Sequence, residues 1–165
     1  MKTRILLPVI LCITIFLLNT SFLIEEPYYI GKQSFTMLRN ITKRDRQVFT
    51  GHYLSFNEIH KGDKQLIKDD YLGMDKFYVS EDNWKLKAII DYILLRRKGA
   101  LAGIKWQNIR YVDFVYNINA NDGVTGCEGV LFFKYKKRTF SVEVKCIYSG
   151  SEFKILEMNN FTDHT

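Results

Sequence analysis

Residues 124–149 have the sequence VTGCEGVLFFKYKKRTFSVEVKCIYS, and their pattern indicates the fold class. Apolar and polar side chains alternate on both sides of the basic pair Lys136-Lys137, and this period of two is typical of a β-hairpin. With that pair as the turn, Tyr135 lies opposite Arg138 and the register of both strands is fixed. The register gathers an apolar set on one face, made of the pairs Phe133–Phe140, Leu131–Val142, Gly129–Val144 and Cys127–Cys146.

Strand patterns continue on both sides of this hairpin. Residues 109–119 alternate in the same way before it, and residues 153–158 do so after it. The separators Asn121-Asp122-Gly123 and Ser149-Gly150-Ser151 have the composition of tight turns. Because every connection is short, we expect a four-stranded antiparallel meander.

The N-terminal half of the chain carries helical patterns. Apolar residues recur at helical spacing from Ser34 onward and again, more weakly, over residues 56–71. A third helix is predicted from the N-cap Ser80 to Lys98, with Gly99 as its C-cap. Helices gathered on one side of an antiparallel sheet define an α+β fold, so we expect N-terminal helices packed on a curved four-stranded sheet.

The first 24 residues have a different character. Lys2 and Arg4 precede the apolar run ILLPVILCITIFLL, residues 5–18, and residues 19–24 extend that run. This layout is typical of a signal peptide or of an uncleaved signal-anchor helix, and its charges place the following domain beyond the cytoplasmic membrane. Signal peptidase requires small side chains at positions −3 and −1, and neither Leu18 with Thr20 nor Asn19 with Ser21 is a good pair. Residues 5–24 are long enough to cross a bilayer core, so both alternatives stay open.

These patterns predict the organisation of the chain. We expect a signal peptide or signal-anchor at residues 1–24, a linker at 25–33, a single α+β domain at 34–161 and a disordered tail at 162–165. The cytoplasmic membrane is then the partner of residues 5–24. The domain is extracytoplasmic, either anchored by one helix or secreted after cleavage.

The composition restricts the class of protein. The 165 residues are 47% hydrophobic and 25% charged, with 10 Gly and 2 Pro, which excludes a disordered or low-complexity chain. A single apolar segment excludes a polytopic membrane protein. The net charge of +6 comes from scattered basic residues rather than from a dense stripe with interleaved aromatics, so we expect no nucleic acid among the partners.

Cys127 and Cys146 lie directly opposite each other in the predicted hairpin. Opposed residues of an antiparallel pair have Cα atoms about 4.5 to 5.5 Å apart, a separation that a disulfide accepts. In an oxidising compartment this pair would form a structural disulfide that stabilises the fold by about 3 kcal/mol. Two reduced, buried thiols are the alternative.

Three helices followed by a strongly curved antiparallel sheet form an order that resembles the cystatin-like and nuclear-transport-factor-2-like superfamily. The stretch His60-Lys61-Gly62-Asp63 before Tyr71 is similar to the polar turn of many such helices. The strand Glu152-Phe153-Lys154-Ile155-Leu156 looks like the closing strand of exported bacterial members. The resemblance implies a cone between sheet and helices. The chain has no Gln-x-Val-x-Gly loop, so it does not imply protease inhibition.

Motifs for catalysis and for metal or cofactor binding are not found in the sequence. It has no Gly-rich phosphate loop and no Gly-x-Ser-x-Gly elbow, and its 3 His lack metal-ligand spacing. We therefore expect no metal and no cofactor. Enzymes of similar architecture hold an acid and a base in the cone, which makes Asp113 and Tyr116 the catalytic candidates. Strand alternation nevertheless puts Asp113 on the more polar face.

Two classes of function follow. The leading interpretation is a non-enzymatic binding or assembly domain of unknown partner, in which aromatic side chains line the concave sheet face or the mouth of the cone. The expected contacts are Trp106, Tyr111, Tyr116 and Tyr148. The alternative is a small enzyme or ligand carrier that uses Asp113 and Tyr116 in an enclosed pocket between sheet and helices. A homodimer formed through the sheet is a further expectation for the partners.

Overall fold

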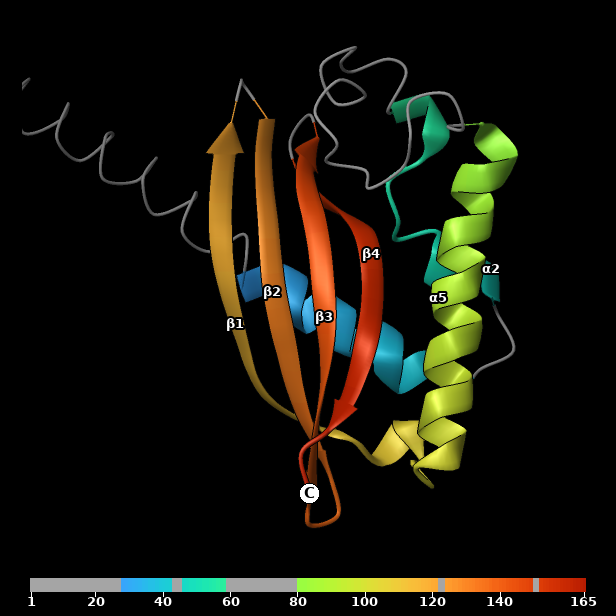
Figure 1. Cartoon of the computed structure of the whole chain (residues 1–165), viewed down its shortest axis with the longest axis vertical. Coiled ribbons are helices and arrows are strands. Elements are labelled where there is room, and N and C mark those ends of the chain that lie inside the picture. Colours follow the sequence, from blue (N-terminus) through green and yellow to red (C-terminus); the bar gives the residue numbers. More distant parts are fainter. Residues whose placement is uncertain (1–27, 43–45, 59–79, 122–123, 150–151) are drawn as a thin grey trace, which may run out of the picture.

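The computed structural model describes residues 28–42, 46–58, 80–121, 124–149 and 152–165 (Figure 1). In these ranges it is an α+β structure with helices and a four-stranded antiparallel sheet. The predicted signal or anchor and the stretch from His60 to Tyr71 lie outside the described residues. Among the helices that are described, none combines the length and the apolarity that a membrane crossing requires.

The sheet is a meander with the strand order β1-β2-β3-β4. The strands are β1 (Arg110–Asn121), β2 (Val124–Tyr135), β3 (Arg138–Ser149) and β4 (Glu152–Asp163). The predicted register of the central hairpin is confirmed, because Tyr135 pairs with Arg138 and Cys127 pairs with Cys146. Lys136 in the turn has a φ of 56°, the left-handed conformation that two-residue hairpin turns require.

Strand β4 is longer than the sequence pattern predicted. We expected a shorter strand and a disordered tail at residues 162–165, but β4 continues to Asp163. A bulge at Asn160, whose φ is 49°, interrupts the alternation on which the prediction depended. Beyond the bulge, Nε2 of His164 lies 2.8 Å from the Ser141 hydroxyl, so the end of the chain is held on the sheet.

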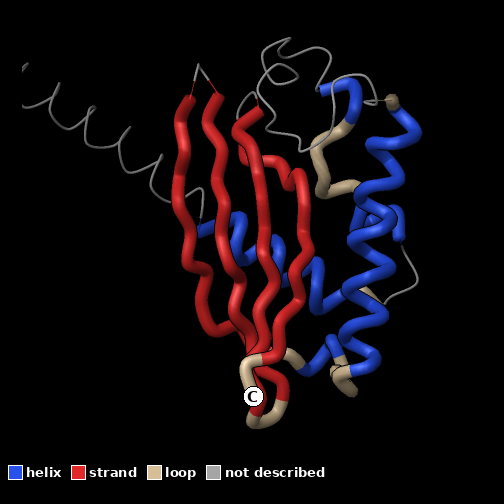
Figure 2. Tube along the Cα trace, in the orientation of Figure 1, coloured by secondary structure: helices blue, strands red, loops and turns tan. Residues whose placement is uncertain are grey.

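The helices cover one face and one side of the sheet. Residues 28–40 are helical and pass behind the sheet, whereas α5 (Glu81–Leu101) stands beside β4 (Figures 1 and 2). The short helix α2 (Arg46–Thr50) contacts α5, and residues 56–58 are also helical.

The first helix begins before Ser34, where we expected it to start. Residues 28–33, predicted as part of a linker, are helical, and Ile30 is buried in the core. Gly31 permits a close crossing of this helix over β1, because a Cβ at that position would lie 2.5 Å from Cβ of Phe114. Burial of these residues against the sheet extends the helix beyond the segment that its periodicity indicated.

Helix α5 starts as predicted and ends later. The Ser80 hydroxyl caps it by accepting a hydrogen bond from the Asn83 amide at 3.2 Å. Gly99 is not the C-cap, because it lies inside α5, where a Cβ would come within 2.1 Å of the Trp106 ring. The helix is terminated instead at Gly103, whose φ of 69° is the left-handed conformation of a glycine cap.

The two cysteines of the central hairpin are free thiols, and the expected disulfide is not formed. Both lie in the core between sheet and helices. The Cys146 thiol is directed at the Cys127 carbonyl oxygen, to which it donates a hydrogen bond at 3.3 Å. Its interaction with the Cys127 side chain, together with burial, raises the pKa of Cys146. The register prediction is therefore confirmed, whereas the structure does not show the predicted disulfide and directs the Cys146 thiol at a backbone acceptor.

Candidate functional site

The structure does not bring the two catalytic candidates together. Asp113 is exposed on β1, and its Oδ1 accepts a hydrogen bond from the Phe114 amide at 2.8 Å. Tyr116 lies on the opposite face of the strand, where its ring stacks on Phe114 with centroids 5.6 Å apart. These two residues therefore form no acid–base pair in a shared pocket.

Three of the four aromatic residues expected as contacts belong to the core or pack against it. Trp106 is 2% exposed, and its ring centre lies 5.9 Å from that of Phe133. Tyr111 and Tyr148 are half-buried against the core cluster. Of the four, Tyr116 alone is exposed. The concave face, where we expected recognition, is thus largely packed with side chains.

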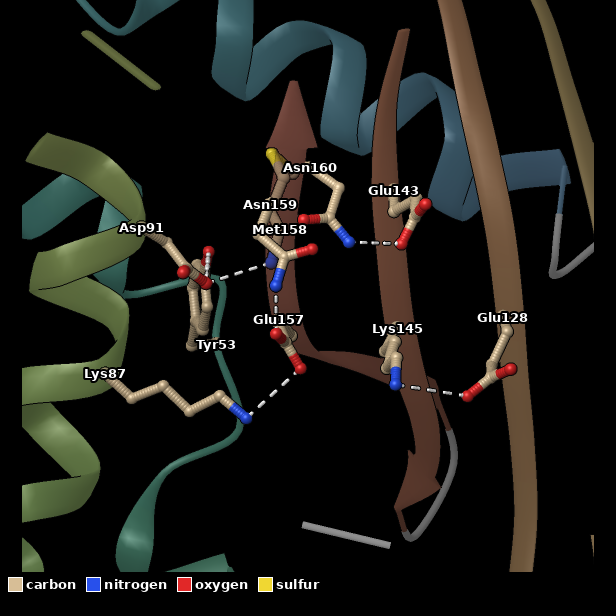
Figure 3. Close-up of polar contacts among 10 residues, drawn as sticks. All are labelled: Tyr53, Lys87, Asp91, Glu128, Glu143, Lys145, Glu157, Met158, Asn159 and Asn160. Atoms are coloured by element: carbon tan, nitrogen blue, oxygen red, sulfur yellow. Dashed lines mark hydrogen bonds and ion pairs between the residues drawn. The ribbon is translucent and has the colours of Figure 1, made fainter. Parts of the chain in front are cut away.

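A buried carboxylate joins helix α5 to strand β4. Asp91 lies near the middle of α5 and is 5% exposed (Figure 3). Its Oδ2 accepts hydrogen bonds from the Met158 amide at 2.9 Å and from the Tyr53 hydroxyl at 3.0 Å. Because β4 is an outer strand, the Met158 amide points away from the sheet and would lack an acceptor without the Asp91 carboxylate.

Burial sets the protonation of this cluster. It raises the pKa of Asp91 to about 6, and the negative charge of Glu157 adds to that effect. The two hydrogen bonds and the positive charge of Lys87 act in the opposite direction. Burial, followed by the nearby Asp91 carboxylate, raises the pKa of Tyr53. Tyr53 is therefore a hydrogen-bond donor throughout the physiological pH range.

Asp91 also lines a groove of about 450 Å³ between α5 and β4. The wall formed by α5 includes Leu86, Ile90 and Leu94, and the wall formed by β4 includes Asn160 and Phe161. A larger hollow of about 600 Å³ lies between α2 and the start of α5, and its lining reaches Asn57, beside residues that the structure does not describe. The groove at Asp91 has described residues on both of its walls.

The outward face of α5 carries a row of exposed apolar side chains. Leu86, Ile90, Ile93 and Leu94 follow helical spacing on it, and each is between 43% and 52% exposed. The opposite face is covered by the core through Trp84, Ala88, Tyr92 and Leu95. A helix that is apolar on both faces is normally covered on both. In the described part of the chain, the outward face of α5 remains accessible.

Polar side chains surround this apolar stripe. Lys87 forms an ion pair with Glu157 at 3.3 Å, and both side chains are largely buried (Figure 3). The side-chain amide of Asn160, at the bulge of β4, donates to Glu143 at 2.7 Å. Lys98 lines the groove one helical turn beyond Leu94. The groove therefore has an apolar centre and a polar rim of both charges.

The sequence analysis missed Asp91. A signal was available, because Asp91 stands at helical spacing between Ala88 and Leu95, both of which belong to the predicted apolar face of the helix. A single carboxylate on such a face requires buried partners, since an unpaired charge is costly to bury. The partners, Tyr53 and Met158, could not be found by spacing because they come from distant parts of the chain.

Among the described residues, no three His, Cys, Asp or Glu side chains lie close enough to hold a metal ion. Comparison of the chain with protein-family models, with curated proteins and with solved structures gives no match.

Proposed function

We propose that this protein is an exported, non-enzymatic binding or assembly domain, which holds a segment of a partner protein in the groove between α5 and β4. The observation that carries the proposal is the exposed aliphatic stripe Leu86, Ile90 and Leu94 beside the polar floor at Asp91. Contiguous exposed apolar side chains with a polar rim are typical of interaction sites.

The dimensions of the stripe favour an amphipathic helix as the bound segment. Residues 86–94 cover about 12 Å along the axis of α5, which is room for two turns of a second helix. Such a helix would place its own apolar residues against Ile90 and Leu94 and its polar residues against the rim. At that rim, Lys98 offers a hydrogen-bond donor, and the side-chain amides of Asn159 and Asn160 offer donors and acceptors.

The extracytoplasmic location within this proposal is supported by the sequence alone. Lys2 and Arg4 precede the apolar residues 5–24, and this order supports export with or without cleavage. The proposal therefore includes the cytoplasmic membrane as the partner of residues 5–24, or as the barrier that the mature domain has crossed.

Membership of the cystatin-like or nuclear-transport-factor-2-like superfamily is also part of the proposal. It is supported by the helices and the four-stranded antiparallel meander. Its other support is the closing strand at residues 152–156. A filled concave face with recognition moved to the side of the sheet would make this chain an atypical member of that group.

Photo-cross-linking in the host cell tests the proposed groove. The full chain is produced with a photoreactive amino acid at Ile90 or at Leu94, and we expect discrete adducts of higher mass at both positions. The matched control is Leu101, which is 81% exposed on the same helix and lies outside the groove, and which should give no such adduct. Equal labelling at Leu101 would contradict a specific site.

Binding of the captured protein then has to depend on the groove. After identification by mass spectrometry, the purified partner should bind the full chain, and Ile90→Lys should raise Kd by about tenfold or more, since it puts a charge at an apolar contact. Leu101→Lys should leave Kd nearly unchanged. A partner whose Kd is the same with both variants binds elsewhere, and the proposed function of the groove would then be wrong.

A further inference from the structure

The outer edge of β1 has no partner strand in the described part of the chain. Among the described strands it pairs with β2 alone, from Arg110 to Asn121 with a bulge at Val112. It forms the margin of the sheet opposite β4 (Figure 1). An outer strand presents a row of backbone N–H and C=O groups, which bind either water or another strand.

The composition of β1 lacks the features that usually keep strand edges apart. Residues 114–121, FVYNINAN, contain no charged side chain and no proline. The single bulge of the strand lies near its start, between Tyr111 and Asp113. Four of its apolar residues are between 37% and 57% exposed, namely Val112, Val115, Tyr116 and Ile118. A long, uncharged and partly apolar edge of this kind favours pairing with another strand.

We infer that β1 pairs with β1 of a second copy, antiparallel about a two-fold axis, and so joins two four-stranded sheets into one. The inference is independent of the groove between α5 and β4. A two-fold axis normal to the sheet makes the same edge complementary to itself. Charge favours a second copy as the occupant, because Asp113 is the only charged residue from Tyr111 to Asn121, and pairing about the middle of the strand opposes no like charges.

Strand alternation determines which residues meet in this pair. Opposed residues must lie on the same face, and the regular part of β1, residues 113–121, is centred on Asn117. Pairing about Asn117 places Tyr116 of one copy opposite Ile118 of the other. Both are exposed apolar residues on the face that carries the buried Phe114, so the dimer would cover apolar surface on both copies.

The first helix adds aromatic surface next to this edge. Nζ of Lys32 lies 3.7 Å from the ring centre of Tyr111 on β1 and 5.3 Å from that of Tyr28. Tyr28 is therefore close to β1, and about half of it is exposed. A strand pair of nine residues extends about 30 Å. Tyr28 would add to the surface area buried in the dimer, and specific interfaces bury roughly 1,000 Å² or more.

Cysteine cross-linking of the full chain tests the pairing. In a Cys12→Ser background, Asn117→Cys lies on the two-fold axis, and mild oxidation should link it to its copy as a disulfide dimer. Val115→Cys lies about 13 Å from its copy in this register and should link at least fivefold less. Glu128→Cys, exposed on β2, is the matched control and should not link. The inference would be overturned if Glu128→Cys gave as much disulfide-linked dimer as Asn117→Cys, or if Asn117→Cys gave none.

A second measurement separates pairing through β1 from association through the apolar N-terminal segment. Analytical ultracentrifugation in detergent should show a dimer of the full chain and a monomer of Val115→Lys or Tyr116→Lys, because a lysine on the edge opposes strand pairing. Ile93→Lys, at an equally exposed apolar position on α5, should leave the dimer intact. A wild-type chain that stays monomeric, or a dimer that survives the β1 lysines, would overturn the inference that two copies pair through β1.

Discussion

The two outer strands of the sheet differ in how their edges are covered. The edge of β4 is partly closed by the chain itself: the Leu54 amide donates to the Ile155 carbonyl at 2.8 Å, and Asp91 accepts from the Met158 amide. β4 also carries two register shifts and four charged residues, Glu152, Lys154, Glu157 and Asp163. In the described residues, β1 has no such cover, and its only charged residues are Arg110 and Asp113, both near its start. A covered strand edge cannot accept a further strand, whereas an uncovered edge can.

Removing the Asp91 carboxylate, which covers part of the β4 edge, should have the largest effect on stability. Asp91→Ala leaves the Met158 amide and the Tyr53 hydroxyl buried without their acceptor, so we expect the free energy of unfolding to fall by about 3 kcal/mol at pH 5. Urea unfolding followed by circular dichroism measures this loss. Asp113→Asn on the open strand is the control and should change stability by less than about 0.5 kcal/mol. Similar losses for both variants would remove the distinction between the two edges.

The pH dependence of stability tests the role of Asp91 at the covered edge of β4. Its pKa of about 6 in the folded protein exceeds the ordinary value of 3.8, so the folded state binds the proton more readily. Stability from this group therefore rises as pH falls from 7 to 4, by about 2 kcal/mol. The measurement is the difference in unfolding free energy between wild type and Asp91→Asn at each pH, which cancels the other titrating groups. If the difference in unfolding free energy between wild type and Asp91→Asn stays constant with pH, the raised pKa of Asp91 is contradicted.

On the side of β1, the strand is held through one face rather than through its edge. Gly31→Ala puts a Cβ against Cβ of Phe114, which cannot move without displacing β1. We expect a loss of about 1.5 kcal/mol from overpacking, measured by urea unfolding. Thr36→Ala, exposed on the same helix, should cost less than about 0.5 kcal/mol. Equal losses would mean that the helix does not support β1 at Gly31.

The smallest expected difference is between two ion pairs. Lys87–Glu157 joins α5 to β4 and is largely buried, whereas Lys145–Glu128 joins two inner strands and is about half exposed. Lys87→Met should cost about 1 kcal/mol and Lys145→Met less than about 0.5 kcal/mol, since solvent screens exposed pairs. Thermal unfolding at low and high salt compares them. A larger loss for Lys145→Met would argue against a special contact between α5 and β4.

Local pattern was sufficient to predict the central sheet. The alternation around Lys136-Lys137 predicted that Cys127 would pair with Cys146, because a hairpin with a two-residue turn has a single register. The N-cap Ser80 was predicted for the same reason, since the signal lies within a few neighbouring residues. The direction of the Cys146 thiol depends on details of packing. The pairing of Cys127 with Cys146 in the register is therefore not enough to predict a disulfide between them.

Features that depend on distant contacts were not predictable from spacing. Gly99 looked like a helix terminus, but its lack of a side chain makes room for Trp106, which only the folded chain brings close. β4 extended past its apparent end because the bulge at Asn160 shifts the alternation by one residue. Asp91 is important because Tyr53 and Met158 reach it from other elements. The candidate site itself was therefore found only in the structure.

Amide hydrogen exchange, resolved by residue on the full chain at low concentration, compares the two edges most directly. The Met158 amide, held by Asp91, should exchange at least about 100-fold more slowly than the outward-facing amides of β1, which are every second residue of that strand. Asp91→Ala should remove the protection of Met158. Equal exchange at Met158 and at the outer edge of β1 would show that the molecule does not cover one edge and leave the other open.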